Sequence, residues 1–213
     1  MTKAIIFDAD DTLIKFSNIA APIFQKTASN LKLKVPKKEQ INRLWGRSLE
    51  FMVNDFWSNE YFTKFKKEYI KLLSEYKFKE INGASKVISE LSKNYSLGII
   101  SAKPRVNMIK HFKDAKIDTK IFKFMFSADD TKYHKPDPRV FNQSIRQLRL
   151  EKEEILYVGD TIIDCVAAKF AGLQFVAVLT GHYKRSEFIE VGLEKQNILS
   201  SIRDLPKWVE KNG

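Results

Sequence analysis

Residues Lys3–Leu13 read KAIIFDADDTL, an apolar run that leads directly into acidic residues. The run Ala4–Phe7 predicts a strand that is buried on both faces, as in a parallel sheet covered by helices. Asp8 and Asp10 follow the end of this strand, where open α/β sheets have their ligand-binding crevice. The stretch therefore predicts a buried first strand with a polar site at its carboxyl end.

Three carboxylates, those of Asp8, Asp10 and Asp11, lie within four consecutive positions. Carboxylates crowded in this way resist ionising together unless a cation or a proton lies between them. A hard divalent ion such as Mg2+ would relieve the repulsion, because it prefers oxygen ligands. The alternative interpretation is that these acidic residues simply end the strand and turn the chain.

The composition indicates a globular protein of one large domain, or of one domain that carries an insertion. Of the 213 residues, 44% are hydrophobic and 30% are charged. No apolar run approaches the roughly 18–20 residues of a membrane span, and the N-terminus leads into a strand pattern and not into a signal peptide. We therefore expect a cytoplasmic monomer or homodimer without membrane contact. The single cysteine, Cys165, excludes an intramolecular disulfide and predicts a small buried side chain.

The net charge of +11 raises the possibility of a polyanionic partner. Residues 16–80 are the more basic part of the chain, with 13 basic and 7 acidic side chains. Many of these lysines alternate with aromatic residues at helical spacing, which is typical of a solvated face over a buried stripe. No zinc-finger spacing or RNP-like strand accompanies them, so we expect no nucleic-acid partner.

Between about Ile19 and Lys79 the apolar residues follow helical spacing, with no strand pattern among them. This spacing predicts about four helices inserted after the first strand. The rest of the chain alternates helix and strand as in βαβ units. We expect a core made of residues 1–15 and 81–213, and a helical cap made of residues 16–80. The predicted core elements are strands at 96–100, 124–127, 154–158, 173–179 and 198–199, and helices at 83–91, 105–112, 139–148, 163–171 and 205–209.

Polar residues also follow the later strands of the predicted core. Ser101 follows the second strand, and Lys135 lies in the loop after the third. Asp160 follows the fourth strand, and Asp164 comes four positions later. Each alone has an ordinary interpretation, as a strand-end cap, a solvated lysine or a helix cap. Because the carboxyl ends of parallel strands share one edge of the sheet, together they predict a single site.

In this combination the residues resemble the haloacid dehalogenase (HAD) superfamily over essentially the whole chain. Within it, the pattern is similar to the phosphoglycolate phosphatase and β-phosphoglucomutase branch. The resemblance implies an α/β fold: a doubly wound, Rossmann-like core with a mainly parallel sheet of five to six strands, plus an inserted C1-type helical cap. It is carried by four motifs: Asp8-x-Asp10-x-Thr12, Ser101, Lys135-Pro136-x-Pro138 and Gly159-Asp160-x-x-x-Asp164.

The resemblance also implies a role for each matched residue. Asp8 would attack phosphorus to give an aspartyl-phosphate, and Asp10 would act as the general acid and base. Mg2+ would be held by the Asp8 carboxylate, the Asp10 backbone carbonyl and Asp160. Asp164 would hold a metal-bound water or orient the lysine, or it would simply be a first-turn acid of its helix.

Ser101 and Lys135 would bind the oxygens of the transferring phosphoryl group. The stretch Leu44-Trp45-Gly46-Arg47 resembles the cap loop that reaches into the site in this branch. Arg47 would bind an anionic leaving group and Trp45 would wall the pocket; the alternative is that Arg47 is a surface residue.

The neighbours of the matched motifs supply further expectations. Phe16 and Asn18 are further candidates for the pocket. Lys103 and His134 flank matched positions, where they would touch phosphate or stay solvated. The sequence departs from the branch at Asp11, where glycine is common, and at Ala102; we expect the Asp11 carboxylate to point to solvent.

The pattern predicts a Mg2+-dependent phosphatase that acts on a small phosphorylated metabolite, either phosphoglycolate-like or a sugar phosphate. A phosphosugar mutase that uses the same residues is the second enzymatic interpretation. A polyanion-binding module that keeps the fold is the non-enzymatic alternative, although such a module has no need for a repulsive carboxylate cluster.

Overall fold

The computed structural model describes all 213 residues, Met1 to Gly213. Its centre is a six-stranded sheet with the order β3-β2-β1-β4-β5-β6, in which every neighbouring pair is parallel. A parallel sheet of this kind needs helices on both faces. The strands are β1 (Ala4–Phe7), β2 (Ser96–Ile100), β3 (Phe122–Phe126), β4 (Ile155–Gly159), β5 (Gln174–Val178) and β6 (Ile198–Leu199).

The first strand is buried on both faces, as its sequence predicts. Ile5 and Phe7 pack into the larger of two hydrophobic cores, and Ala4 and Ile6 pack into the smaller one on the opposite face. All four side chains are fully buried. This alternation follows from the two-residue period of a strand, and it explains why the run contains no polar residue.

Helices cover both faces of the sheet. The larger core takes side chains from α5 (Ala84–Leu91), α6 (Arg105–Asp114) and α10 (Leu205–Asn212). The smaller core takes side chains from α8 (Ile162–Ala171) and α9 (Arg185–Glu190), and α7 (Asn142–Leu148) packs on its edge. The prediction of an α/β, Rossmann-like fold is therefore confirmed.

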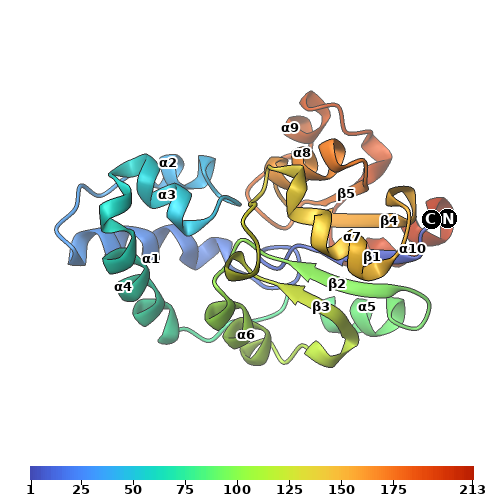
Figure 1. Cartoon of the computed structure of the whole chain (residues 1–213), viewed down its shortest axis with the longest axis horizontal. Helices are drawn as coiled ribbons and strands as arrows, with labels where there is room; N and C mark the ends of the chain where they lie inside the picture. Colours follow the sequence, from blue (N-terminus) through green and yellow to red (C-terminus); the bar gives the residue numbers. More distant parts are fainter.

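The insertion between β1 and β2 is helical throughout. Figure 1 shows its helices gathered to one side of the sheet, facing the arrowheads of β2 and β3, with both chain termini at the opposite end. The chain segments that enter and leave the insertion are joined by two backbone hydrogen bonds. They run from Lys15 N to Lys79 O at 2.9 Å and from Ile81 N to Leu13 O at 2.7 Å. That residues 16–80 form a separate cap domain stays a prediction. The helices are α1 (Ser17–Asn30), α2 (Lys38–Arg43), α3 (Leu49–Phe56) and α4 (Phe62–Ser74).

Two core elements differ from the sequence prediction. Helix α9 was not expected, because it has six residues and buries only Phe188, too few for a periodic pattern. The helix predicted at 139–148 begins as a 3-10 turn, Pro138–Phe141, before α7. Asp137 caps that turn by accepting from Arg139 N. None of the helices combines the length and the apolar character that crossing a membrane requires.

Candidate active site

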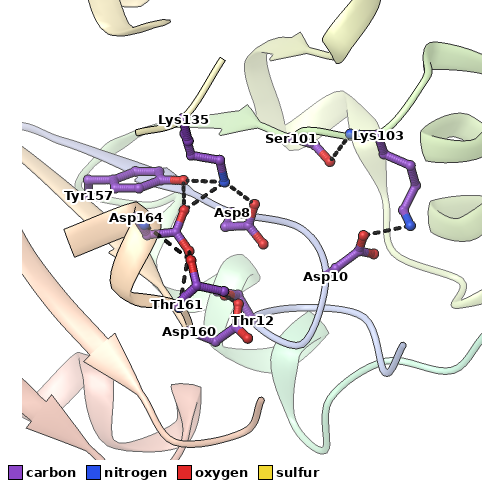
Figure 2. Close-up of polar contacts among 10 residues, drawn as sticks. All are labelled: Asp8, Asp10, Thr12, Ser101, Lys103, Lys135, Tyr157, Asp160, Thr161 and Asp164. Carbon is purple, nitrogen blue, oxygen red and sulfur yellow. Dashed lines mark hydrogen bonds and ion pairs between the residues drawn. The ribbon is translucent and has the colours of Figure 1, made fainter. Parts of the chain in front are cut away.

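The carboxyl ends of the central strands bring the predicted polar residues to one place. Asp8 follows β1, Ser101 follows β2 and Asp160 follows β4, and these three strands are neighbours in the sheet. Lys135 comes from the loop after β3 and Asp164 from the first turn of α8. Figure 2 shows their side chains converging around Asp8. One cavity of about 60 Å³ is lined by these side chains, except that of Ser101. Asp10, Trp45 and Arg47 line the same cavity.

The ammonium group of Lys135 lies at the centre of this constellation. Its Nζ donates to Asp8 Oδ1 at 2.6 Å, to Asp164 Oδ1 at 2.6 Å and to the Tyr157 hydroxyl at 3.0 Å. Burial lowers the pKa of Lys135, but the two carboxylates outweigh burial and raise that pKa well above its usual value. Lys135 is therefore a permanent, fully hydrogen-bonded cation held against Asp8.

Asp164 is buried, and both of its oxygens accept hydrogen bonds. Oδ1 also accepts from the Tyr157 hydroxyl at 2.8 Å, and Oδ2 accepts from Thr161 N at 3.1 Å and from the Thr161 hydroxyl. Thr161 Oγ1 in turn accepts from Asp164 N at 3.1 Å, which caps the start of α8. These bonds fix the carboxylate that holds Lys135 in place.

An acidic group lies beside the lysine. Asp8, Asp160 and Asp164 each offer an oxygen within 4.8 Å of the others, and all three are buried. Burial is the main cause that raises the pKa of Asp8 to about 7 and that of Asp160 well above its usual value. Without a further cation, burial therefore favours the protonated forms of these carboxyl groups, because Lys135 alone does not compensate three negative charges.

The structure offers a direct sign that this group suits a metal ion. Asp160 Oδ2 is buried and has no hydrogen-bond partner, while Oδ1 accepts from the Thr12 hydroxyl at 3.4 Å. A Cβ atom at Gly181 would lie 1.9 Å from Oδ2, so the chain at this position has room only for glycine. An unpartnered carboxylate oxygen within a buried acidic group fits a hard divalent cation.

Asp10 lies apart from the acidic group and forms an ion pair of its own. Its Oδ2 is 2.5 Å from Lys103 Nζ, and Lys103 Nζ also lies 3.4 Å from the centre of the Phe16 ring. Lys103 is only 7% exposed, which excludes the solvated alternative. In the sequence, the only indication that Lys103 belongs to the site is its position two residues after Ser101. The Ser101 hydroxyl accepts a hydrogen bond from Lys103 N at 3.2 Å.

Of the pocket residues predicted in the segment 16–80, three line the cavity and one does not. Trp45, Arg47 and Phe16 line the cavity, and the Trp45 and Phe16 rings stack with their centres 5.3 Å apart. The Arg47 guanidinium lies 4.6 Å from the centre of the Phe51 ring. Asn18 is exposed and does not line the cavity.

The comparison with known proteins accords with this geometry. The family model for haloacid dehalogenase-like hydrolases matches residues 5–178. The chain belongs to this family. This match confirms the resemblance to the HAD superfamily that the motifs indicated, and it confirms the prediction of a hydrolase. The buried acidic group is compatible with the divalent metal that hydrolases of this family generally use.

Named relatives span most of the chain. A phosphoglycolate phosphatase from Photorhabdus laumondii is 28% identical over 214 residues, covering 95% of this chain and 90% of that protein. A putative pyrophosphatase, PpaX, from Clostridium perfringens is 26% identical over 182 residues, 84% of each chain. A solved hydrolase from Pseudomonas syringae shares the fold with a TM-score of 0.86, at 21% identity and over the full length of both chains.

The expectation that the Asp11 carboxylate points to solvent is wrong. Asp11 is 1% exposed, and its Oδ1 accepts from Phe16 N and from Ser17 N, both at 2.9 Å. Its φ of +53° lies in the left-handed region, which favours glycine and which aspartate tolerates. In this HAD-like hydrolase Asp11 therefore takes the backbone shape of the usual glycine and caps the start of α1. The sequence could not show this, because the contact depends on the chain turning back at residue 16.

Replacing Asp11 separates its hydrogen bonds from its charge. Asp11→Ala should lower the free energy of unfolding by about 1–2 kcal/mol, because the amides of Phe16 and Ser17 lose their acceptor. Asp11→Asn keeps an acceptor oxygen and tolerates the same φ, so it should stay within about 0.5 kcal/mol of the wild type. Urea unfolding of the three proteins at one pH measures the difference. Equal midpoints for Asp11→Ala and the wild type would contradict the capping role.

Magnesium should stabilise the protein more at pH 8 than at pH 5. The pKa of Asp8 rises from 3.8 to about 7 on folding, so the stability associated with this group is full below pH 3.8 and is lost as the pH rises through 7. A cation beside the ionised carboxylate offsets that loss. We expect MgCl2, relative to EDTA, to raise Tm by about 3 °C or more at pH 8 and by less at pH 5. Asp160→Asn should abolish the effect, whereas the exposed control Asp55→Asn should retain it.

Proposed function

We propose that this chain is a Mg2+-dependent phosphatase that hydrolyses a small phosphorylated metabolite through an aspartyl-phosphate on Asp8. One observation carries the proposal. In a single cavity, an oxygen of buried Asp8 lies 2.6 Å from the Lys135 ammonium, and Asp8 forms with Asp160 and Asp164 an acidic group that suits a cation. An anionic nucleophile can approach an anionic phosphate only where positive charge offsets the repulsion. The phosphoglycolate phosphatase among the named relatives supports the same reaction.

The metal would be held by Asp8, Asp160 and the backbone carbonyl of Asp10, with Asp164 as the remaining acidic neighbour. Bound Mg2+ would neutralise the charge on the phosphoryl oxygens and on the nucleophile. Lys135 engages only Oδ1 of Asp8, which leaves Oδ2 for the cation or for phosphorus. Because both oxygens of Asp164 already accept hydrogen bonds, its main proposed role is to orient Lys135.

The reaction would proceed in two displacements. An oxygen of Asp8 forms a bond to phosphorus as the ester P–O bond breaks, and Asp10 donates a proton to the departing oxygen. A water molecule then attacks phosphorus and gives a proton to Asp10. The bond between phosphorus and the Asp8 oxygen breaks, so that phosphate is released and the Asp8 carboxylate is regenerated. Lys135 would exchange one of its three protein hydrogen bonds for a phosphoryl oxygen in both steps, and the Ser101 hydroxyl would bind another oxygen.

The helical segment 16–80 would act as a cap that excludes water from the cavity and selects the substrate. Trp45 would wall the pocket, and Arg47 would bind an anionic part of the substrate. The support for both is that they line the same cavity as Asp8 and Lys135, although they come from the loop between α2 and α3.

Asp8→Asn tests the proposed function. Wild-type protein should release phosphate and nitrophenol in equal amounts from p-nitrophenyl phosphate when MgCl2 is present, and EDTA should stop the reaction. Asp8→Asn should reduce kcat by at least about 1,000-fold, because the amide is a poor nucleophile. The control Asp55→Asn makes the same chemical change at an exposed position of α3 and should leave kcat unchanged. Metal-independent hydrolysis, or activity that survives in Asp8→Asn, would refute the proposal.

Lys103 should act as a positioning residue for Asp10, and the choice of leaving group reveals this role. Alkyl alcohols need a proton from Asp10 as they depart, whereas nitrophenolate leaves readily without one. Lys103→Met should therefore reduce kcat for an alkyl phosphate about 10-fold more than kcat for p-nitrophenyl phosphate, and Lys103→Arg should restore part of the difference. Equal losses on both substrates would show that Lys103 does not act through Asp10.

A further inference from the structure

The cavity above Asp8 has two walls of different chemistry. The wall formed by the core is polar and contains the carboxylates and lysines described above, which Figure 2 shows together. The opposite wall is formed by the linker after β1 and by the cap, and its side chains are large and apolar. They are Phe16, Trp45, Leu49, Met52 and Tyr69, each less than 9% exposed.

The apolar wall is held firmly in place. The Phe16 ring stacks with Trp45 and also contacts the Lys103 ammonium, which ties the wall to the ion pair of Asp10. Leu49 and Met52 lie three residues apart on α3 and therefore present one face to the cavity. Tyr69 reaches the same cavity from α4. Three separate segments of the chain thus converge to make this wall.

Few polar groups interrupt the wall on the cap side. The Trp45 indole N–H, the Tyr69 hydroxyl and the Arg47 guanidinium are the polar side-chain groups that the cap contributes to the cavity. Arg47 also lines two outer hollows of about 410 and 620 Å³, together with His134 and Arg139, so it stands at the mouth of the cavity. The cap side of the cavity therefore presents mainly aromatic rings and methyl groups to a leaving group, and Arg47 borders the outer hollows.

We propose that the leaving group of the substrate is apolar next to the ester oxygen, so that the preferred substrate is a phosphate monoester of a small aliphatic or aromatic alcohol, with any anionic group of that alcohol at its far end, beside Arg47. This inference rests on the phosphatase function proposed above. Each sugar hydroxyl would give up its hydrogen bonds to water on entering the cavity and would find few partners on the cap wall. A methylene group at the same position would gain from the burial. The geometry thus disfavours a polyhydroxylated sugar phosphate.

A matched pair of substrates tests the inference on the wild-type protein. Propyl phosphate and glycerol 1-phosphate have the same three-carbon chain and differ by two hydroxyl groups. With MgCl2 present, we expect kcat/KM for propyl phosphate to exceed that for glycerol 1-phosphate by at least about 10-fold. Equal values, or a preference for glycerol 1-phosphate, would overturn the inference.

A polar substitution in the wall should reduce the preference. Met52→Gln adds an amide that can hydrogen-bond a hydroxyl group, so the ratio of the two kcat/KM values should fall several-fold. The control Ile109→Gln introduces the same side chain on α6, where residue 109 is 53% exposed, and should leave the ratio unchanged. An unchanged ratio in Met52→Gln that unfolds at the wild-type Tm would count against the wall as the selecting element. The wild-type pair stays decisive if Met52→Gln does not fold.

Hydrolysis of p-nitrophenyl phosphate separates this inference from the proposed function. If the wild type hydrolyses that compound with MgCl2 but prefers glycerol 1-phosphate to propyl phosphate, the inference of an apolar leaving group is refuted and the proposed phosphatase function stands. If the wild type hydrolyses no phosphate monoester, the proposed function fails and the inference fails with it.

Discussion

The ammonium group of Lys135, held between Asp8 and Asp164, is the interaction on which the rest of the site depends. Three carboxylates are buried within a few ångströms of one another, and their mutual repulsion would oppose folding without a fixed positive charge. Lys135 supplies that charge and uses all three of its protons in hydrogen bonds. The acidic residue left without such a partner, Asp160, is the one that most needs a further cation.

The parallel sheet makes this arrangement possible. Each strand delivers its carboxyl end to the same edge, so residues separated by more than 100 positions in the sequence come into contact. The two hydrophobic cores on the faces of the sheet stabilise that edge. The inserted helices then close the cavity from outside, with Phe16 and Lys103 linking the two sides.

The sequence predicted which residues converge, because the carboxyl ends of parallel strands share one edge of the sheet. The structure brings Asp8, Lys135, Asp160 and Asp164 together as their positions predicted. Most of the strands are also where the apolar runs predicted them, since a strand buried on both faces leaves a continuous signal. Helix α9 left no such signal, because it buries a single side chain.

By itself, the sequence determined the order of the elements, the burial of β1 and the acidic character of the site, because these depend on local composition and period. The tertiary structure decided what each charge contacts. Asp11 turned out to be a buried cap and not a solvated acid, and Lys103 a buried partner of Asp10. The reason is physical: the partner of each of these side chains comes from a distant segment, and the local pattern around Asp11 and Lys103 does not specify which segment that is.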